Sequence, residues 1–309
     1  MRMVTRNKGR KGVVGVELRG DALACAHVKR DAGQPAVSAF EYRALEAGGE
    51  ASALSAFVQR HGLKGADCVG VIPQGDYQLL QVEPPEVPAA ERRQAIKWRL
   101  RERIDFPVAE AVVDVFDPPQ GARRRADNLN AVVCRAGIVA RCVETIQAAG
   151  LQLQALDIVE LVQRNVLAAL TEPGSATALL SFQEDAGLIT LVKDAELYLA
   201  RDLDYGLAGM REAGAAGDAN APIYESIVLE LQRSLDYFES SFGMAAINRL
   251  LVYPQGDGVD QLLSYIEGTL PSLQTAILDP GQVFDSGTVI PPGCLNAFGA
   301  ALRQREAAA

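Results

Sequence analysis

The sequence predicts an α/β protein built from two similar halves, each with three antiparallel strands followed by a helix and a parallel strand. Two stretches carry this prediction: "VVGVELRGDALACAHVKRDAGQPAVSAFEY" near the N-terminus and "TALLSFQEDAGLITLVKDAELYLARDL" in the middle of the chain. Each contains three aliphatic and β-branched runs separated by short polar turns, which is typical of antiparallel meanders. The 309 residues, 49% of them hydrophobic, suffice for two domains with sizeable cores.

Composition argues against several classes of protein. A formal net charge of −9 disfavours a protein that tracks nucleic-acid phosphates, which needs a basic face. We expect no membrane span, because no apolar run approaches the roughly 20 residues that a bilayer requires. The five cysteines lack the spacing of metal ligands, so we interpret them as reduced thiols of a cytosolic protein. The basic start, "MRMVTRNKGRKG", lacks the apolar core of a secretory signal and is either a solvated tail or a contact with an anionic membrane surface.

The first elements form the meander and its parallel neighbour. Residues 12–30 predict two strands joined by a tight turn around Gly20, with a third strand after them. A helix follows near Ala51–His61. The apolar run "CVGVIP" at 68–73 then predicts a buried strand parallel to the first.

A charged helix and two strands interrupt the first half. The segment "AAERRQAIKWRLRERI" (89–104) predicts the helix, and "EAVVDVF" and "NLNAVVC" predict the strands, with an exposed loop between them. A helix at 137–149, the strand "LQALDIV" and a helix at 160–170 complete this half, which ends near Pro173-Gly174.

The second half follows the same plan. A helix is predicted near Ile223–Phe242, because its apolar residues recur at spacings of three and four. The strand "RLLVYP" follows at 249–254, and the terminal "CLNAFGAALRQRE" predicts a short amphipathic helix that packs back on the first half.

These elements predict three parts of the chain. The first domain covers residues 1–172 and includes an inserted subdomain at about 84–135. The second domain covers 173–294, and the C-terminal helix at 295–309 returns to the first domain.

Six blocks, taken in order, resemble PilM-type pilus assembly proteins, and especially the MshI branch of MSHA pilus biogenesis. They are "GVVGVELRG", "QAIKWRLRERIDFPVAEAVVDV", "IQAAGLQLQALDIVELVQRNVLAAL", "LVKDAELYLARDL", "IVLELQRSLDYF" and "LNAFGAALR". Each block alone is unspecific, but together they cover nearly the whole chain in the family's order. The resemblance implies the actin-like ATPase fold, with two ribonuclease-H-like domains and a small inserted α/β subdomain.

The resemblance also implies a place and a partner. Members of this family are cytoplasmic components of type IV pilus machines, peripheral to the inner membrane. The implied partner is a PilN-like single-pass membrane protein, whose cytoplasmic N-terminal tail would lie in a groove near residues 84–135. The chain would then be a scaffold in a membrane-associated complex, with no role for nucleic acid.

The two phosphate loops of the family have diverged in this sequence. Active members have Asp-Ile-Gly followed by hydroxyl residues, whereas the first loop here has Glu17, Arg19 and Gly20 without serine or threonine. The second loop matches "SFQEDAGLIT", in which Ser181 replaces the metal-ordering carboxylate and Gly187 follows the turn. We therefore expect a residual cleft that lacks tight binding of ATP with magnesium, and we predict no metal site.

The remaining cleft residues match the family's adenosine side. Gly256 and Gly258 follow a strand and leave room for a ring. Glu230 and Arg233 lie three apart on a helix, where the family contacts the purine and ribose. A plain solvated helix face explains these two residues equally well.

The basic helix is the candidate surface for the partner, and we assign Trp98, Arg99, Arg101 and Phe106 to it. Trp98 is either a support of the core or an anchor for a peptide. The basic side chains are either simply solvated, or they pair with acidic segments of a partner, or they bind anionic lipid.

No motif supplies an independent catalytic centre. HExxH, GxSxG, Walker A and GxGxxG are all absent, so we predict no catalytic residue and no enzyme. The favoured hypothesis is a non-catalytic scaffold. The alternative is a nucleotide-switched actin-like ATPase of the same machinery, and the eroded phosphate loops argue against it. A relative of sugar or acetate kinases would need a carboxylate base that no motif provides.

Overall fold

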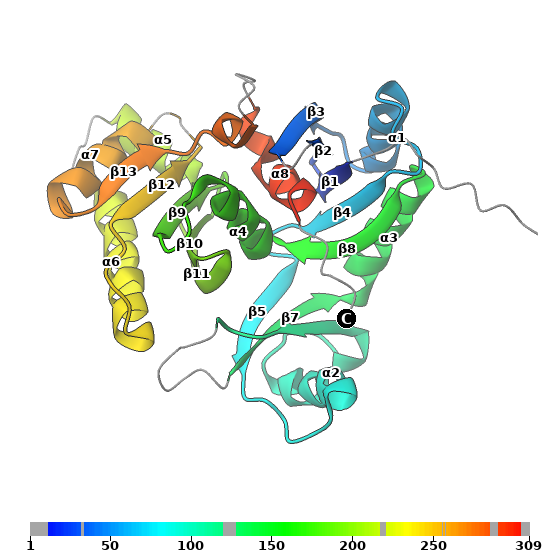
Figure 1. Ribbon diagram of the computed structural model, residues 1–309, viewed down its shortest axis with the longest axis horizontal. Helices are drawn as coiled ribbons and strands as arrows, with labels where there is room; N and C mark the ends of the chain where they lie inside the picture. Colours follow the sequence, from blue (N-terminus) through cyan, green and yellow to red (C-terminus); the bar gives the residue numbers. More distant parts are fainter. Residues whose placement is uncertain are drawn as a thin grey trace, which may run out of the picture. The chain divides into compact units, whose positions relative to one another are not determined.

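The computed structural model divides into two compact units (Figure 1), and each is described by itself. Unit 1 comprises Met1–Asp76, Ala136–Val166 and Pro280–Ala309, and unit 2 comprises Tyr77–Arg135 and Leu167–Asp279. The structure describes residues 12–31, 34–119, 128–216, 221–254, 256, 258–284 and 290–303. The basic N-terminal stretch and most of the loop expected after Pro118 lie outside these residues.

Unit 1 is built on a five-stranded sheet in the order β3-β2-β1-β4-β8. The meander consists of β1 (Val13–Leu18), β2 (Ala22–Asp31) and β3 (Gln34–Ala44), all antiparallel. Next to β1 lie β4 (Asp67–Ile72) and then β8 (Gln152–Ile158), both parallel to it. The predicted strands and the turn at Gly20 are therefore confirmed.

Helices cover both faces of this sheet (Figure 1). The helices α1 (Glu50–Arg60) and α3 (Ala136–Ala148) pack together on one face. On the other face, α8 (Leu295–Ala301) contacts β1, β2 and β4. The last residues of α4 (Val159–Leu170) belong to unit 2, and η3 (Pro280–Phe284) packs beside β3.

The C-terminal helix differs from its sequence-based expectation. All seven residues of α8 are buried, so the described helix has no polar face, and residues 304–306 of the predicted amphipathic segment lie outside the described residues. The reason is close packing on the sheet: a Cβ built on Gly15 of β1 would lie 1.8 Å from Ala297 O. Only a glycine at this position lets the helix approach the strand so closely.

Unit 2 contains a second five-stranded sheet in the order β11-β10-β9-β12-β13. Its strands are β9 (Ala176–Phe182), β10 (Gly187–Lys193), β11 (Glu196–Leu203), β12 (Arg249–Tyr253) and β13 (Gln274–Ile277). The antiparallel meander, followed by parallel strands, repeats the plan of unit 1. The predicted internal repeat is confirmed.

Three helices complete this part of unit 2: α5 (Leu207–Ala215), α6 (Pro222–Phe242) and α7 (Val259–Thr269). The apolar face of α6 packs into the core of the sheet, as its spacing predicts. The sequence did not indicate α5 or β13.

A three-stranded sheet in the order β5-β7-β6 forms the inserted part, with β5 (Tyr77–Val82), β6 (Ala111–Phe116) and β7 (Leu129–Arg135). On it pack α2 (Ala89–Arg99) and the following turn η1 (Leu100–Glu102), through a core that contains Ile96 and Leu100. A second turn, η2 (Val108–Glu110), precedes β6. This segment falls in unit 2, whereas we assigned it to the first domain. Across the described ranges, no helix is both long and apolar enough to span a membrane.

Candidate functional site

Glu17, the carboxylate of the first expected phosphate loop, is fully buried near the end of β1. Arg19 Nη2 donates to Glu17 Oε2 at 2.7 Å. Asn296 Nδ2, from the first turn of α8, donates to Glu17 Oε1 at 2.9 Å. Both carboxylate oxygens therefore bind groups of the same chain.

Arg19 and Gly20 lie in the turn after β1, and each has a role within that turn. Burial alone would lower the pKa of the Arg19 guanidinium, but the charge and hydrogen bond of Glu17 outweigh burial and raise it. Gly20 has a φ of +86°, which an L side chain rarely adopts, and Arg19 N donates to Ala22 O at 3.0 Å to close the hairpin. Gly20 is thus required by the turn itself.

The second expected loop, between β9 and β10, is closed by contacts within unit 2. Ser181 is buried, and its Oγ donates to Leu188 O at 3.4 Å. Gly187 faces the ring of Phe182, since an added Cβ would lie 2.9 Å from Phe182 Cδ1. At Gly187, close packing accounts for the glycine without a ligand.

The same loop also covers the start of α5. Leu207 N donates to Gln183 O, and Ala208 N donates to Glu184 O, both at 2.9 Å. The first amides of a helix are the groups that bind an anion at its N-terminus. Here these two amides are satisfied by backbone carbonyls.

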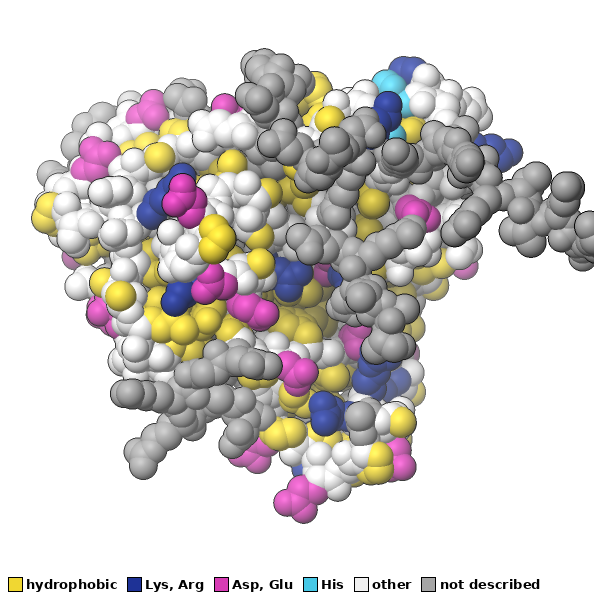
Figure 2. Space-filling view, in the orientation of Figure 1, with side chains coloured by type: hydrophobic (Ala, Val, Ile, Leu, Met, Phe, Trp, Pro, Cys, Tyr) yellow, Lys and Arg dark blue, Asp and Glu magenta, His cyan; other side chains and the backbone are white. Residues whose placement is uncertain are grey.

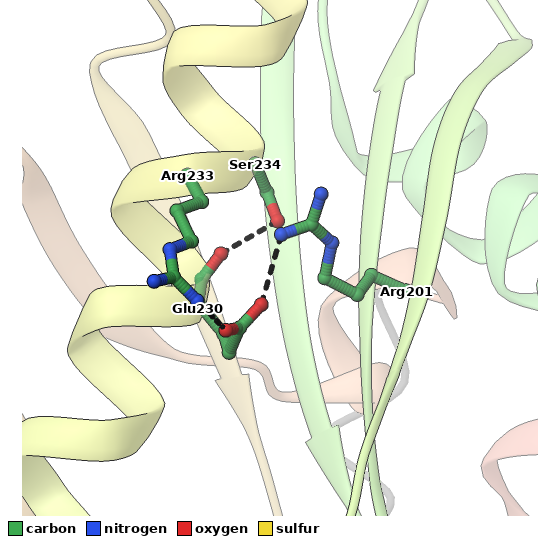
Figure 3. Close-up of polar contacts among 4 residues, drawn as sticks. All are labelled: Arg201, Glu230, Arg233 and Ser234. Carbon is green, nitrogen blue, oxygen red and sulfur yellow. Dashed lines mark hydrogen bonds and ion pairs between the residues drawn. The ribbon is translucent and has the colours of Figure 1, made fainter.

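Glu230 and Arg233 form a charge cluster with Arg201 of β11 (Figure 3). Glu230 Oε2 accepts from Arg201 Nη1 at 2.9 Å, and Oε1 accepts from Arg233 Nη1 at 2.5 Å. Burial would raise the pKa of this carboxyl, but hydrogen bonds from Arg233 and Arg201 and their charges lower it. Ser234 Oγ donates to Glu230 O at 2.7 Å and adds a contact along the helix.

Of the two glycines before α7, Gly258 is needed for helix packing and Gly256 is not. Gly258 has a φ of +84°, and a Cβ there would lie 2.3 Å from Met210 O of α5. Gly256 is open, with no atom within 4 Å of a built Cβ, and its carbonyl accepts from Val259 N at 3.0 Å.

The predicted cleft residues come from four segments of the chain. Glu17, Arg19 and Gly20 are adjacent in unit 1, whereas the other six lie on three segments of unit 2. Sequence reasoning missed Asn296 and Arg201, which bind the two predicted carboxylates. The quoted blocks "LNAFGAALR" and "LVKDAELYLARDL" contain both residues, but no spacing rule links them to their partners.

On the basic helix, Trp98 lies on the surface of the inserted part. Its side chain is 57% exposed, whereas Ile96 and Leu100 on the opposite face of the segment are 0% and 1% exposed. Trp98 thus does not support the core, and its role as an anchor for a peptide stays a prediction.

The arginines near Trp98 differ in what they contact. Arg99 Nη1 donates to Glu83 O at 3.1 Å and Arg103 Nη1 to Gln81 O at 2.8 Å, so both bind backbone carbonyls at and just beyond the end of β5. Among the described residues, Arg101 pairs with its exposed neighbour Glu102, at 3.0 Å. All three arginines are exposed, but Arg99 and Arg103 are tied to the strand end, and we call the exposed Trp98 and Arg101 the α2 surface.

Phe106, the fourth residue assigned to the partner, is partly buried. It packs against the core of the inserted part, and Arg135 Cζ lies 4.2 Å from the centre of its ring. Phe106 therefore helps to pack the inserted part, and its contact with a partner stays a prediction.

Metal and thiol chemistry have little support in the described part of the chain. No group of three or more His, Cys, Asp or Glu residues there could hold a metal ion. All five cysteines are buried and free of disulfides. On the face in Figure 2, acidic and basic side chains are interspersed, without one extended basic patch among the residues drawn in colour.

The fold resembles that of solved structures. A chain of the PilM-PilN type IV pilus biogenesis complex matches with a TM-score of 0.74 at 21% identity, over 95% of this chain and 98% of that chain. A Bacteroides thetaiotaomicron protein with an actin-like ATPase fold and unknown function matches with a TM-score of 0.51 at 9% identity, over 91% and 98%. No protein-family model and no curated protein matches the sequence. The chain has the actin-like ATPase fold, which confirms the predicted fold class.

Proposed function

We propose that this chain is a cytoplasmic scaffold of a type IV pilus assembly platform, peripheral to the inner membrane and of the MshI kind. Its partner is the cytoplasmic N-terminal tail of a PilN-like single-pass membrane protein. The likeness in fold to a chain of the PilM-PilN complex supports this proposal, as does the order of the six sequence blocks.

The exposed Trp98 is the observation that carries the proposal. A tryptophan that is 57% exposed leaves a large apolar surface in water, and tryptophan is enriched among residues that dominate binding energy. Arg101 lies three residues further along the same face and is exposed, so it is available to pair with an acidic or backbone group. Together they offer an apolar anchor beside a cation.

We further propose that the nucleotide site is degenerate. ATP with magnesium needs free carboxylate oxygens for the hydrated metal and free amides for the phosphates. Both oxygens of Glu17 are engaged within the chain, and so are the first two amides of α5. These residues do not fit ATP with magnesium.

Co-purification with the partner's tail tests the scaffold function. We expect the wild-type chain to retain the tagged tail peptide, and Trp98→Ala and Arg101→Ala to lose most of it. Leu229→Ala is the matched control, because Leu229 is also exposed, at 45%, but lies on α6. Equal retention by Trp98→Ala and wild type would show that the tail does not use the α2 surface.

Calorimetric titration with ATP and magnesium separates the scaffold from the alternative. A scaffold with a degenerate site gives no sub-micromolar binding. Tight binding that alters retention of the tail would favour a nucleotide-switched ATPase.

A further inference from the structure

Two buried carboxylates lie at the carboxyl ends of parallel strands in unit 1. Glu17 on β1 pairs in register with Val71 on β4, and Val71 pairs with Asp157 on β8. Because neighbouring strands lie about 4.8 Å apart, the two carboxylates share one row about 10 Å long on one face of the sheet. Their side chains are 0% and 2% exposed. We call Glu17 and Asp157 the carboxylate row.

Each carboxylate of the row is paired with an arginine of the same unit. Arg19 Nη2 lies 2.7 Å from Glu17 Oε2, and Arg303 Nη1 lies 2.7 Å from Asp157 Oδ2. A guanidinium keeps its charge at every pH at which a protein is folded. The row therefore contains one fixed cation for each buried anion.

The helix α8 lies along the carboxylate row and contacts both of its ends. Asn296, in the first turn, donates to Glu17, and Arg303, just beyond the last turn, binds Asp157. Seven residues of helix span about 10 Å, which matches the length of the row. Between these ends, Gly15 allows α8 to approach β1, and Gly299 allows it to approach α4.

The carboxylate row lies where sheets of this kind bind ligands, so it matters which groups neutralise its negative charge. Open α/β sheets bind ligands at the carboxyl ends of their strands, and divalent cations at such sites bind carboxylate oxygens. A buried carboxylate without a partner is strongly destabilising. Something must therefore neutralise this row, and in this chain the arginines do so.

We infer that Arg19 and Arg303 are built-in counter-ions that take the place of a metal ion at the carboxylate row and hold α8 on the sheet without any ligand. The inference concerns unit 1 alone and does not depend on the proposed binding of a pilus protein. It predicts that the stability of unit 1 depends on these two ion pairs and is indifferent to divalent cations.

Urea unfolding of the full chain tests the inference through charge-specific rescue. Arg19→Gln is expected to lower the unfolding midpoint clearly, because Glu17 is left as an unpaired buried anion. Adding Glu17→Gln to that variant is expected to restore most of the midpoint, and Arg19→Lys to retain it. The same pattern is expected for Arg303→Gln with Asp157→Asn. Arg101→Gln is the matched control, since its ion pair with Glu102 is exposed and should contribute little.

Three results would overturn the inference. The first is an unfolding midpoint for Arg19→Gln equal to that of Arg101→Gln. The second is a double variant with Glu17→Gln that is no more stable than Arg19→Gln alone. The third is binding of Mn²⁺ by the wild-type chain, measured by electron paramagnetic resonance, that Glu17→Gln abolishes. The expected spectrum is that of free Mn²⁺ for both proteins. Neither measurement involves the tail peptide, so a failure here is distinct from a failure of the scaffold function.

Discussion

Replacing Gly299 by alanine sets helix propensity against packing. Gly299 lies inside α8, and alanine is about 1 kcal/mol more favourable than glycine in the interior of an exposed helix. In this structure, however, a Cβ at Gly299 would lie 2.1 Å from Val162 O, a backbone atom of α4. The two helices would have to separate by about 1 Å to relieve this contact.

The packing effect should prevail. Overpacking of a tight core costs about 1–3 kcal/mol, and a separation of the helices also weakens the hydrogen bond from Asn165 Nδ2 to Gly299 O, which contributes about 1 kcal/mol. After the propensity gain is subtracted, we expect Gly299→Ala to lower the free energy of unfolding by about 2 kcal/mol.

Urea unfolding followed by circular dichroism measures this difference. Gly268→Ala is the matched control, because Gly268 lies in α7 and a Cβ there would meet no atom within 4 Å. This control should be neutral or stabilised by up to about 1 kcal/mol. The reasoning is refuted if Gly299→Ala is as stable as wild type, or if both variants move the midpoint in the same direction by the same amount.

Three further predictions concern stability, pH and thiol reactivity. Ile96→Ala should lower the free energy of unfolding by about 2–5 kcal/mol, because Ile96 is fully buried. Trp98→Ala should stay within about 0.5 kcal/mol of wild type. A large loss of stability in the Trp98 variant would contradict its surface position. Burial lowers the pKa of His27 from 6.5 to about 4, so the unfolded chain binds more protons between these values and stability should fall as the pH drops from 6.5 to 4. His27→Gln should flatten that slope in unfolding curves taken across this range, and an unchanged slope would rule out His27 as its source. All five thiols should resist iodoacetamide in the native chain and react after unfolding, because all five are buried. For Cys294, burial also raises the pKa of the thiol to about 12. Labelling of the native chain, detected by mass spectrometry, would contradict the burial.

Much of the fold follows from local sequence patterns. The repeat was predictable because each meander has regular apolar runs and short turns, and α6 because its apolar residues recur at helical spacing. The missed elements carry weaker signals. The strand β5 reads "YQLLQV" without a clear alternation, β13 has only four residues, and α5 contains Gly209 and Gly214, which disfavour a helix.

The candidate site could be predicted only in part, because its contacts join residues far apart in sequence. The sequence placed Glu17 and Arg19 in the same expected phosphate loop. It could not indicate that Asn296, 279 positions away, donates to the same carboxylate. The burial of α8 could not be predicted from the sequence either, since Gly15 and Ala297 come into contact only in the folded chain.

The most direct test of the proposed function uses Trp98, the single tryptophan of the chain, as its own reporter. Adding the cytoplasmic N-terminal peptide of the PilN-like protein should shift the emission maximum of the wild-type chain to shorter wavelength in a saturable titration, because the exposed indole becomes buried under the peptide. A scrambled peptide should leave the spectrum unchanged. Saturable binding of the tail by calorimetry, with an unchanged tryptophan spectrum, would contradict the assignment of the α2 surface, and the absence of binding in both measurements would contradict the scaffold function.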